Sequence, residues 1–114
     1  MRMWMVDPRI MCTKHLLGEH VELHMFAAHF RLKRYIAEYV DHNCVSPKRL
    51  ISRHKALVKE MKQRKFKHQS EIEGFSISYL PSEQRNAVVD SKKSEKDLLG
   101  RCIECRARKK ELIG

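Results

Sequence analysis

The chain has 114 residues, of which 42% are hydrophobic, and its 24 Lys and Arg outnumber 14 Asp and Glu to give a formal net charge of +10. This hydrophobic content excludes a disordered chain, and the presence of only four Gly and three Pro argues against a turn-rich β-sandwich or barrel. We therefore expect a single domain over residues 1–114 with an all-α fold, a compact bundle of three principal helices with an N-terminal arm packed among them.

The sequence shows no apolar run long enough to span a membrane and no recognisable signal peptide. We therefore expect a cytoplasmic, nucleoid-associated protein that makes no membrane contact. The positive charge predicts an anionic partner, with double-stranded DNA as the first candidate, and we expect the protein to act as a monomer. The alternative is that the charge only aids solubility.

The N-terminal arm covers residues 1–11. Its apolar residues are too many for a loose tail, so we expect them to be buried against the helices. They are Met1, Met3, Trp4, Met5 and Val6. Pro8 is expected to end any early helix.

Apolar periodicity predicts helices over residues 13–40, 47–65 and about 90–111. Thr13 is the expected N-cap of the first helix and Ser46-Pro47 the expected start of the second. Between the second and third helices we expect an ordered loop at 66–81 and a short helical turn near 82–88.

The first predicted helix carries ionisable groups that a purely structural helix would not need. At about 100° per residue, His15, Glu19, Glu22 and Phe26 fall on one face of the helix, within roughly 60° of one another. A separate apolar stripe, formed by Leu16, Leu23, Ala27 and Phe30, predicts the face that packs on the core. Gly18 lies inside this helix, either to allow close approach of the arm or of a DNA backbone, or as a merely tolerated residue.

This region also carries a family resemblance. It is carried by the stretches Met1-Arg2-Met3-Trp4, Val6-Asp7-Pro8-Arg9, His15-Leu16-Leu17-Gly18-Glu19-His20 and Glu22-Leu23-His24. Later stretches that fit the same family are Arg53-His54, Leu57, Glu60-Met61, Arg64, and Leu98-Leu99-Gly100-Arg101-Cys102 with Cys105. In their order and number they resemble the pyrimidine-dimer DNA glycosylase/AP lyase family, the type that includes a phage UV-damage endonuclease.

The resemblance implies an enzyme that acts on UV-damaged duplex DNA through an imine formed by the N-terminal α-amine. An α-amine, with an ordinary pKa of about 8, suits this chemistry better than a lysine, whose pKa is about 10.4. By position, Met1 would supply the amine, and Glu22 would be the acid/base group. Arg2, His15, Glu19 and Arg101 would contact DNA, and no metal or organic cofactor is expected for the reaction.

The chain departs from the family in three respects. The phage enzyme loses its initiator methionine, whereas this chain begins Met1-Arg2. Aminopeptidases generally need a small second residue, so we expect Met1 to be retained. The family commonly has an arginine before the catalytic glutamate, and the phage enzyme has another arginine three residues after it. Val21 and Met25 stand at these positions here, so phosphate contacts must come from elsewhere or be weaker.

Two other interpretations remain open. His20 and His24, at i and i+4, could share a metal ion, although Glu22 would lie on the opposite side of the helix. Cys102-x-x-Cys105 is half of a zinc site that Cys12, Cys44 or a histidine would have to complete across the fold. These two sites belong to one interpretation, a metal protein. The other interpretation is a noncatalytic, basic DNA-binding helical protein.

Overall fold

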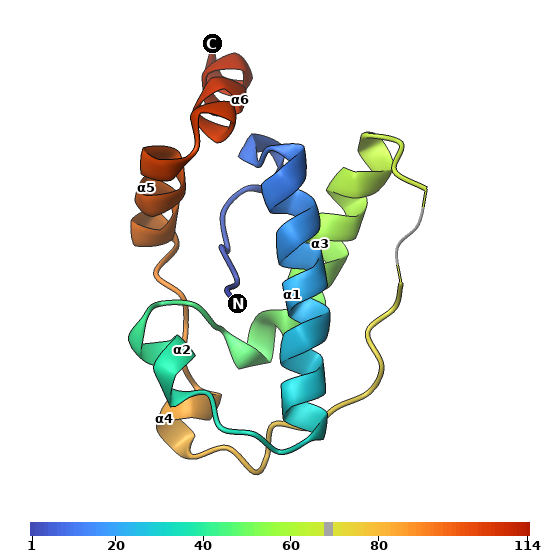
Figure 1. Ribbon diagram of the computed structural model, residues 1–114, viewed down its shortest axis with the longest axis vertical. Helices are drawn as coiled ribbons and strands as arrows, with labels where there is room; N and C mark the ends of the chain where they lie inside the picture. Colours follow the sequence, from blue (N-terminus) through green and yellow to red (C-terminus); the bar gives the residue numbers. More distant parts are fainter. Residues whose placement is uncertain (68–69) are drawn as a thin grey trace.

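The computed structural model describes residues 1–67 and 70–114, and over these residues the fold is all-helical, which confirms the predicted class (Figure 1). The elements in chain order are η1 (Pro8–Ile10), α1 (Thr13–Arg31), α2 (Ala37–Asp41), η2 (Pro47–Arg49), α3 (Leu50–Gln63), α4 (Ser82–Arg85), α5 (Ser91–Arg101) and α6 (Ile103–Ile113). None of the described helices is both long and apolar enough to cross a membrane.

The N-terminal arm is packed into the molecule, as predicted. It runs between α5 and α1 in Figure 1, and Met3, Trp4 and Val6 are buried. The backbone N–H of Met3 donates to the Cys44 carbonyl at 2.6 Å, and the hydroxyl of Ser94 donates to the Trp4 carbonyl at 2.6 Å. The first residues are therefore fixed by contacts with two distant parts of the chain.

Helix α1 is shorter than predicted. It begins after Cys12, which replaces Thr13 as the N-cap, and it ends at Arg31 instead of near residue 40. Lys33 then adopts a left-handed conformation, with φ of 55°, and the chain turns before α2. The turn places Ile36 in the core, 1% exposed, with its backbone N–H donating to the side-chain carbonyl of Gln84 at 2.9 Å.

Helices α1 and α3 lie side by side and form the centre of the fold (Figure 1). The predicted apolar stripe of α1 is buried, as are Leu50 and Leu57 of α3. The second predicted helix is confirmed, because η2 and α3 together cover residues 47–63. Amphipathic periodicity identified both packing faces because burial follows the helical repeat.

The C-terminal region contains two helices where one was predicted. Asp90 is the N-cap of α5, close to the predicted start, but the helix stops at Arg101. Cys102 is extended, with φ of −125° and ψ of 109°, and serves as the N-cap of α6. The break redirects α6 so that it packs beside η1.

The connection from α3 to α5 has little regular structure. Within the described parts of the predicted 66–81 loop, residues 66–67 and 70–81, the chain forms no helix, and residues 68–69 lie outside the description. The short helical turn predicted near 82–88 is present as α4. Its Gln84 joins this connection to the turn that follows α1.

Candidate functional site

The N-terminal nitrogen lies beside a carboxylate of α1. The Met1 nitrogen is 3.9 Å from Oε1 of Glu22, and the backbone N–H of Arg2 donates to Oε2 of the same residue at 3.3 Å. The side chain of Met1 is 7% exposed, whereas that of Glu22 is 32% exposed. The methionine side chain thus anchors the terminus, while the carboxylate stays open to solvent.

Arg2 is held by an aromatic ring and a carboxylate. Its guanidinium carbon lies 3.7 Å from the centre of the Trp4 ring, and Nη1 is 2.9 Å from Oδ2 of Asp97. The other Asp97 oxygen, Oδ1, lies 3.0 Å from Nε of Arg101. Asp97 therefore links two of the arginines that the resemblance assigned to DNA contact.

Asp97 was not among the site residues predicted from the sequence. The only local signal is its i, i+4 spacing to Arg101, which is common on helices. Its partner Arg2 is 95 residues away, so only the folded chain brings them together.

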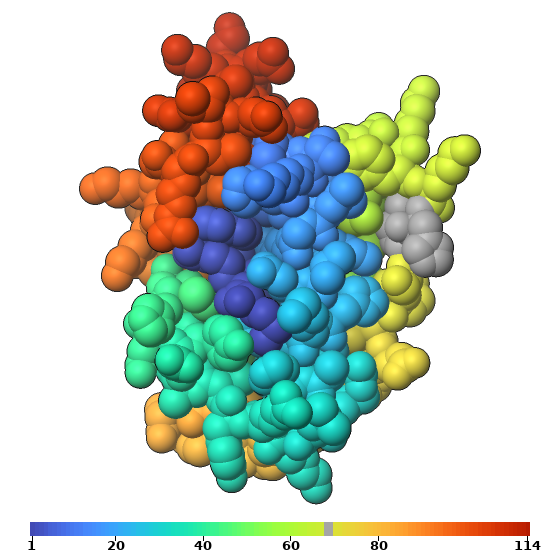
Figure 2. Space-filling view, in the orientation of Figure 1, coloured from blue at the N-terminus to red at the C-terminus, as the bar shows by residue number. Residues whose placement is uncertain are grey.

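A shallow hollow of about 250 Å³ opens beside Arg2. Residues from the α2 turn and from α5 line it: Arg2, Asp41, His42, Asn43, Lys93 and Asp97. The space-filling view shows the dark-blue arm at the surface between α1 and the green and orange segments that carry α2 and α5 (Figure 2). The terminus and Glu22 therefore lie at the edge of an accessible surface.

Glu19 is placed differently from Glu22. Its side chain is 0% exposed and forms a bidentate pair with Arg53 of α3, with Nε to Oε2 at 2.7 Å and Nη2 to Oε1 at 2.8 Å. Arg53 also donates to the Val6 carbonyl at 2.6 Å. The DNA contact predicted for Glu19 stays a prediction, while its position gives it a structural part in joining α1, α3 and the arm.

His15 lies within a cluster of sulfur atoms. Its Nδ1 is 3.1 Å from Sγ of Cys12 and 3.8 Å from Sγ of Cys105, and Sγ of Cys12 is 3.8 Å from Sγ of Cys102. All four potential ligand atoms lie within 4.8 Å of one another. Cys102 and Cys105, the predicted half of a zinc site, therefore lie next to Cys12 and His15 at the start of α1.

The protonation of this cluster reflects burial and local hydrogen bonds. Burial raises the pKa of the Cys105 thiol to about 12. For Cys102, burial acts in the same direction, but hydrogen bonds from Cys105 and Cys12 outweigh it and lower the pKa. Burial, aided by nearby Lys14, lowers the pKa of His15.

The predicted pair of His20 and His24 acquires a third member from α3. Nε2 of His20 lies 3.1 Å from Nε2 of His54, and the His24 ring packs edge-on against both other rings. Glu22 points elsewhere, toward the N-terminus. His54 is buried on the packing face of α3, where it is hydrogen-bonded to His20.

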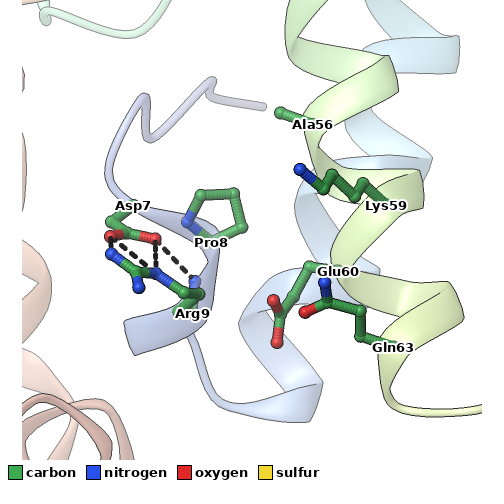
Figure 3. A pocket seen from close by; sticks show the side chains of 7 residues that line it. All are labelled: Asp7, Pro8, Arg9, Ala56, Lys59, Glu60 and Gln63. Carbon is green, nitrogen blue, oxygen red and sulfur yellow. Dashed lines mark hydrogen bonds and ion pairs between the residues drawn. The ribbon is translucent and has the colours of Figure 1, made fainter. Parts of the chain in front are cut away.

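Another hollow of about 460 Å³ lies between η1 and α3 (Figure 3). Its lining residues are Asp7, Pro8, Arg9, Ala56, Lys59, Glu60 and Gln63. Its two carboxylates are already paired, Asp7 with Arg9 at 2.7 Å and Glu60 with Arg64 at 2.8 Å. This hollow includes neither the terminus nor Glu22, so it does not contain the two groups of the predicted reaction.

Residues 1–74 match the family model described as pyrimidine dimer DNA glycosylase. The match includes the arm, α1 and α3, and it ends before Asp97, Arg101 and the Cys102–Cys105 pair. Searches of curated proteins and of solved structures gave no significant match.

Proposed function

Because the chain belongs to the pyrimidine dimer DNA glycosylase family, we propose that it excises damaged pyrimidines and cleaves the resulting abasic site through the α-amine of Met1. The observation that carries this proposal is the 3.9 Å separation between the Met1 nitrogen and the Glu22 carboxylate. An amine and a potential proton carrier at one accessible surface are the two groups that such a reaction needs.

In the proposed reaction the unprotonated amine attacks C1′ of the damaged nucleotide. The bond from C1′ to the base breaks, and the base leaves with the bonding electrons. The amine nitrogen passes one proton to the Glu22 carboxylate and keeps the other, so that opening of the C1′–O4′ bond gives a protonated imine. Glu22 assists by protonating the ring oxygen of the deoxyribose as the ring opens.

Strand cleavage follows from the imine. Loss of a proton from C2′ and departure of the 3′ phosphate, with cleavage of its bond to C3′, is a β-elimination. In this proposal the carboxylate of Glu22 accepts the C2′ proton. Water then releases the sugar fragment and regenerates the amine, so the cycle needs neither an oxidant nor a reductant.

The proposed DNA contacts surround the terminus. On α1, Lys14 and Gly18 are exposed along the helix face that carries Glu22, and on α5, Lys93 and Arg101 are exposed beside the arm. We assign Lys14, Lys93 and Arg101 to phosphate contacts, which position the duplex without reading its sequence. Arg2 fits a contact at the damaged nucleotide, because it is held next to the amine.

The test is borohydride reduction during incubation with two duplexes, one holding an abasic site and one holding a thymine dimer. A covalent protein–DNA adduct is expected with both, and peptide mapping should place it on Met1. Intact-mass measurement establishes whether the mature protein retains Met1. Glu22→Gln should slow cleavage by about a hundredfold or more, whereas Glu38→Gln, at an exposed position of α2, should cleave like the wild type.

The outcomes separate the alternatives. An adduct with the abasic duplex alone would retain the lyase and remove base excision from the proposal. Salt-sensitive DNA binding without any adduct would overturn the catalytic proposal and favour a noncatalytic DNA-binding protein.

A further inference from the structure

Two helix starts that are 90 residues apart converge on one point. Cys12 and Cys102 are the N-caps of α1 and α6, and His15 and Cys105 occupy the third position of the respective helices. The two pairs thus share one spacing, Cys-x-x-His and Cys-x-x-Cys. Only Cys102-x-x-Cys105 was recognisable as a pair from the sequence. Cys12-x-x-His15 was not, because it ends in a histidine and starts the helix that carries the proposed catalytic Glu22.

We propose that Cys12, His15, Cys102 and Cys105 bind one structural Zn²⁺ ion that fastens the C-terminal helix to the N-terminal arm. The residues supply three thiolates and one imidazole, a donor set found in structural zinc sites. The proposal concerns the fold and is independent of the proposed imine chemistry.

The distances fit tetrahedral coordination. With zinc–sulfur bonds of about 2.3 Å, two sulfur ligands of a tetrahedral ion lie about 3.8 Å apart. The Cys12 and Cys102 sulfurs are 3.8 Å apart, and His15 Nδ1 is 3.8 Å from the Cys105 sulfur. The shorter approach of His15 Nδ1 to the Cys12 sulfur, 3.1 Å, needs only a small rotation to reach the same spacing.

The surroundings also suit thiolate ligands. The backbone N–H of Cys12 donates to the Cys105 sulfur at 3.2 Å, and that of Cys105 donates to the Cys102 sulfur at 3.5 Å. Such N–H donors stabilise negative sulfur, and the positive ends of both α1 and α6 point at the cluster. Trp4 packs edge-on against the His15 ring with centroids 5.7 Å apart, which helps to fix the orientation of the ligand.

Helix α6 has few buried residues, so a bound ion would help to attach it to the rest of the fold. Cys105 is the one residue of α6 that is buried in the described structure, while Ile103 and Ile113 are 73% and 74% exposed. Apolar burial therefore contributes little to holding α6 against η1, although the two lie together (Figure 1). A metal ion joining four residues would supply the missing attachment.

The three-histidine cluster of His20, His24 and His54 is the competing metal site. Two of its rings are already hydrogen-bonded to one another, and it offers three ligands at most among the described residues. It also joins α1 and α3, which an extensive apolar core already holds together. The sulfur cluster is therefore the better match to a structural zinc site.

The test is the zinc content of the full chain, purified without chelator under reducing conditions and measured by inductively coupled plasma mass spectrometry. We expect about one zinc per chain in the wild type and in Cys44→Ser, a control at a cysteine outside the cluster. Cys105→Ser and Cys102→Ser should each lower the content about fivefold or more. His54→Gln should leave it unchanged.

Cobalt substitution provides a readout that does not depend on whether a variant folds. Wild-type protein loaded with Co²⁺ should show thiolate-to-cobalt charge transfer and the intense visible bands of tetrahedral coordination. Absence of zinc together with absence of these bands would overturn the proposal. Zinc that survives both cysteine substitutions but is lost in His54→Gln would also overturn it and assign the metal to the histidines. A Cys12–Cys102 disulfide that persists in protein purified under reducing conditions with zinc supplied would also overturn the proposal.

Discussion

Nη1 of Arg2 lies 2.9 Å from Oδ2 of Asp97, so the second residue of the chain is tied to a helix near its other end. Asp97 also binds Arg101, and the Arg2 guanidinium stacks on Trp4. This arrangement fixes the peptide that carries the terminal amine, because the N–H of Arg2 also donates to Glu22. Helix α5 therefore helps to position the proposed catalytic group.

Asp97→Asn should separate the contribution of Asp97 to positioning the amine from its contribution to stability. The change keeps the shape of the side chain but removes its charge, and we expect cleavage of an abasic duplex to slow about tenfold because the amine is less well positioned. The imine should still form on Met1, as borohydride trapping would show. Since both partners are partly exposed, the unfolding free energy should fall by no more than about 1 kcal/mol.

Arg101→Gln is the matched control, since it removes the other partner of Asp97 and leaves Arg2 in place. This variant should weaken DNA binding and reduce its salt dependence, with little change in cleavage at saturating enzyme. Equal single-turnover rates for Asp97→Asn and the wild type would contradict the positioning role.

The Glu19–Arg53 pair should be a major contributor to stability. Removing one member leaves a buried charge without its partner, so Arg53→Met should lower the unfolding free energy by about 3–5 kcal/mol, as measured by urea denaturation. The exposed Asp7–Arg9 pair is the comparison, and Arg9→Gln should change the unfolding free energy far less, because solvent screens an exposed ion pair. A cost of Arg53→Met as small as that of Arg9→Gln would show that the buried pair does not hold the arm.

The helices of the core were predictable from sequence, but their interruptions were not. Apolar periodicity identified α1 and α3 because one face of each is buried along its length. The stop at Arg31 is set by the burial of Ile36 and its bond to Gln84, 48 residues away. The break at Cys102 likewise depends on the approach of Cys105 to Cys12, and no proline marks either position.

The candidate site was predictable where the family pattern covers it. Met1, Arg2 and Glu22 all lie in the N-terminal stretch that carries the resemblance, and they were identified together through it. Asp97 and Arg53 reach the site region from 95 and 34 residues away, and a single sequence carries no signal for such pairs. Half of the sulfur cluster could be predicted, because Cys102-x-x-Cys105 is a recognisable metal-ligand spacing.

Stability should decrease as the solution is acidified through the histidine range. Burial, together with nearby His24, holds the pKa of His54 below its ordinary value of 6.5. From pH 7 downward the unfolded chain therefore binds a proton at this position before the folded chain does, and the unfolding free energy falls until the folded-state pKa is passed. His54→Gln should show a shallower decline between pH 7 and 5 in urea denaturation.

His42→Gln, at an exposed position, is the control for this measurement and should keep the wild-type slope. The comparison isolates His54, because His15 and the other groups remain in both variants. A His54→Gln slope identical to that of the wild type would contradict a folded state that favours neutral His54.

Gly18 should be a position where stability and DNA binding respond in opposite directions. It lies inside α1 on an exposed surface, and a Cβ there would meet no described atom within 4 Å. Alanine is favoured over glycine in a helix, so Gly18→Ala should raise the unfolding free energy by about 1 kcal/mol. Because Gly18 is one turn before Glu22, we expect the added methyl group to obstruct a closely approaching DNA backbone and to weaken binding to an abasic duplex.

Gly100→Ala is the matched control for that variant. Gly100 also lies within a helix, α5, and an added Cβ would likewise meet no described atom within 4 Å. Both variants should therefore gain stability in thermal or urea denaturation, but only Gly18→Ala should lose DNA affinity in a titration at fixed salt. If Gly18→Ala is stabilised and binds DNA as tightly as the wild type, the glycine is merely tolerated, and the DNA backbone passes elsewhere on the surface.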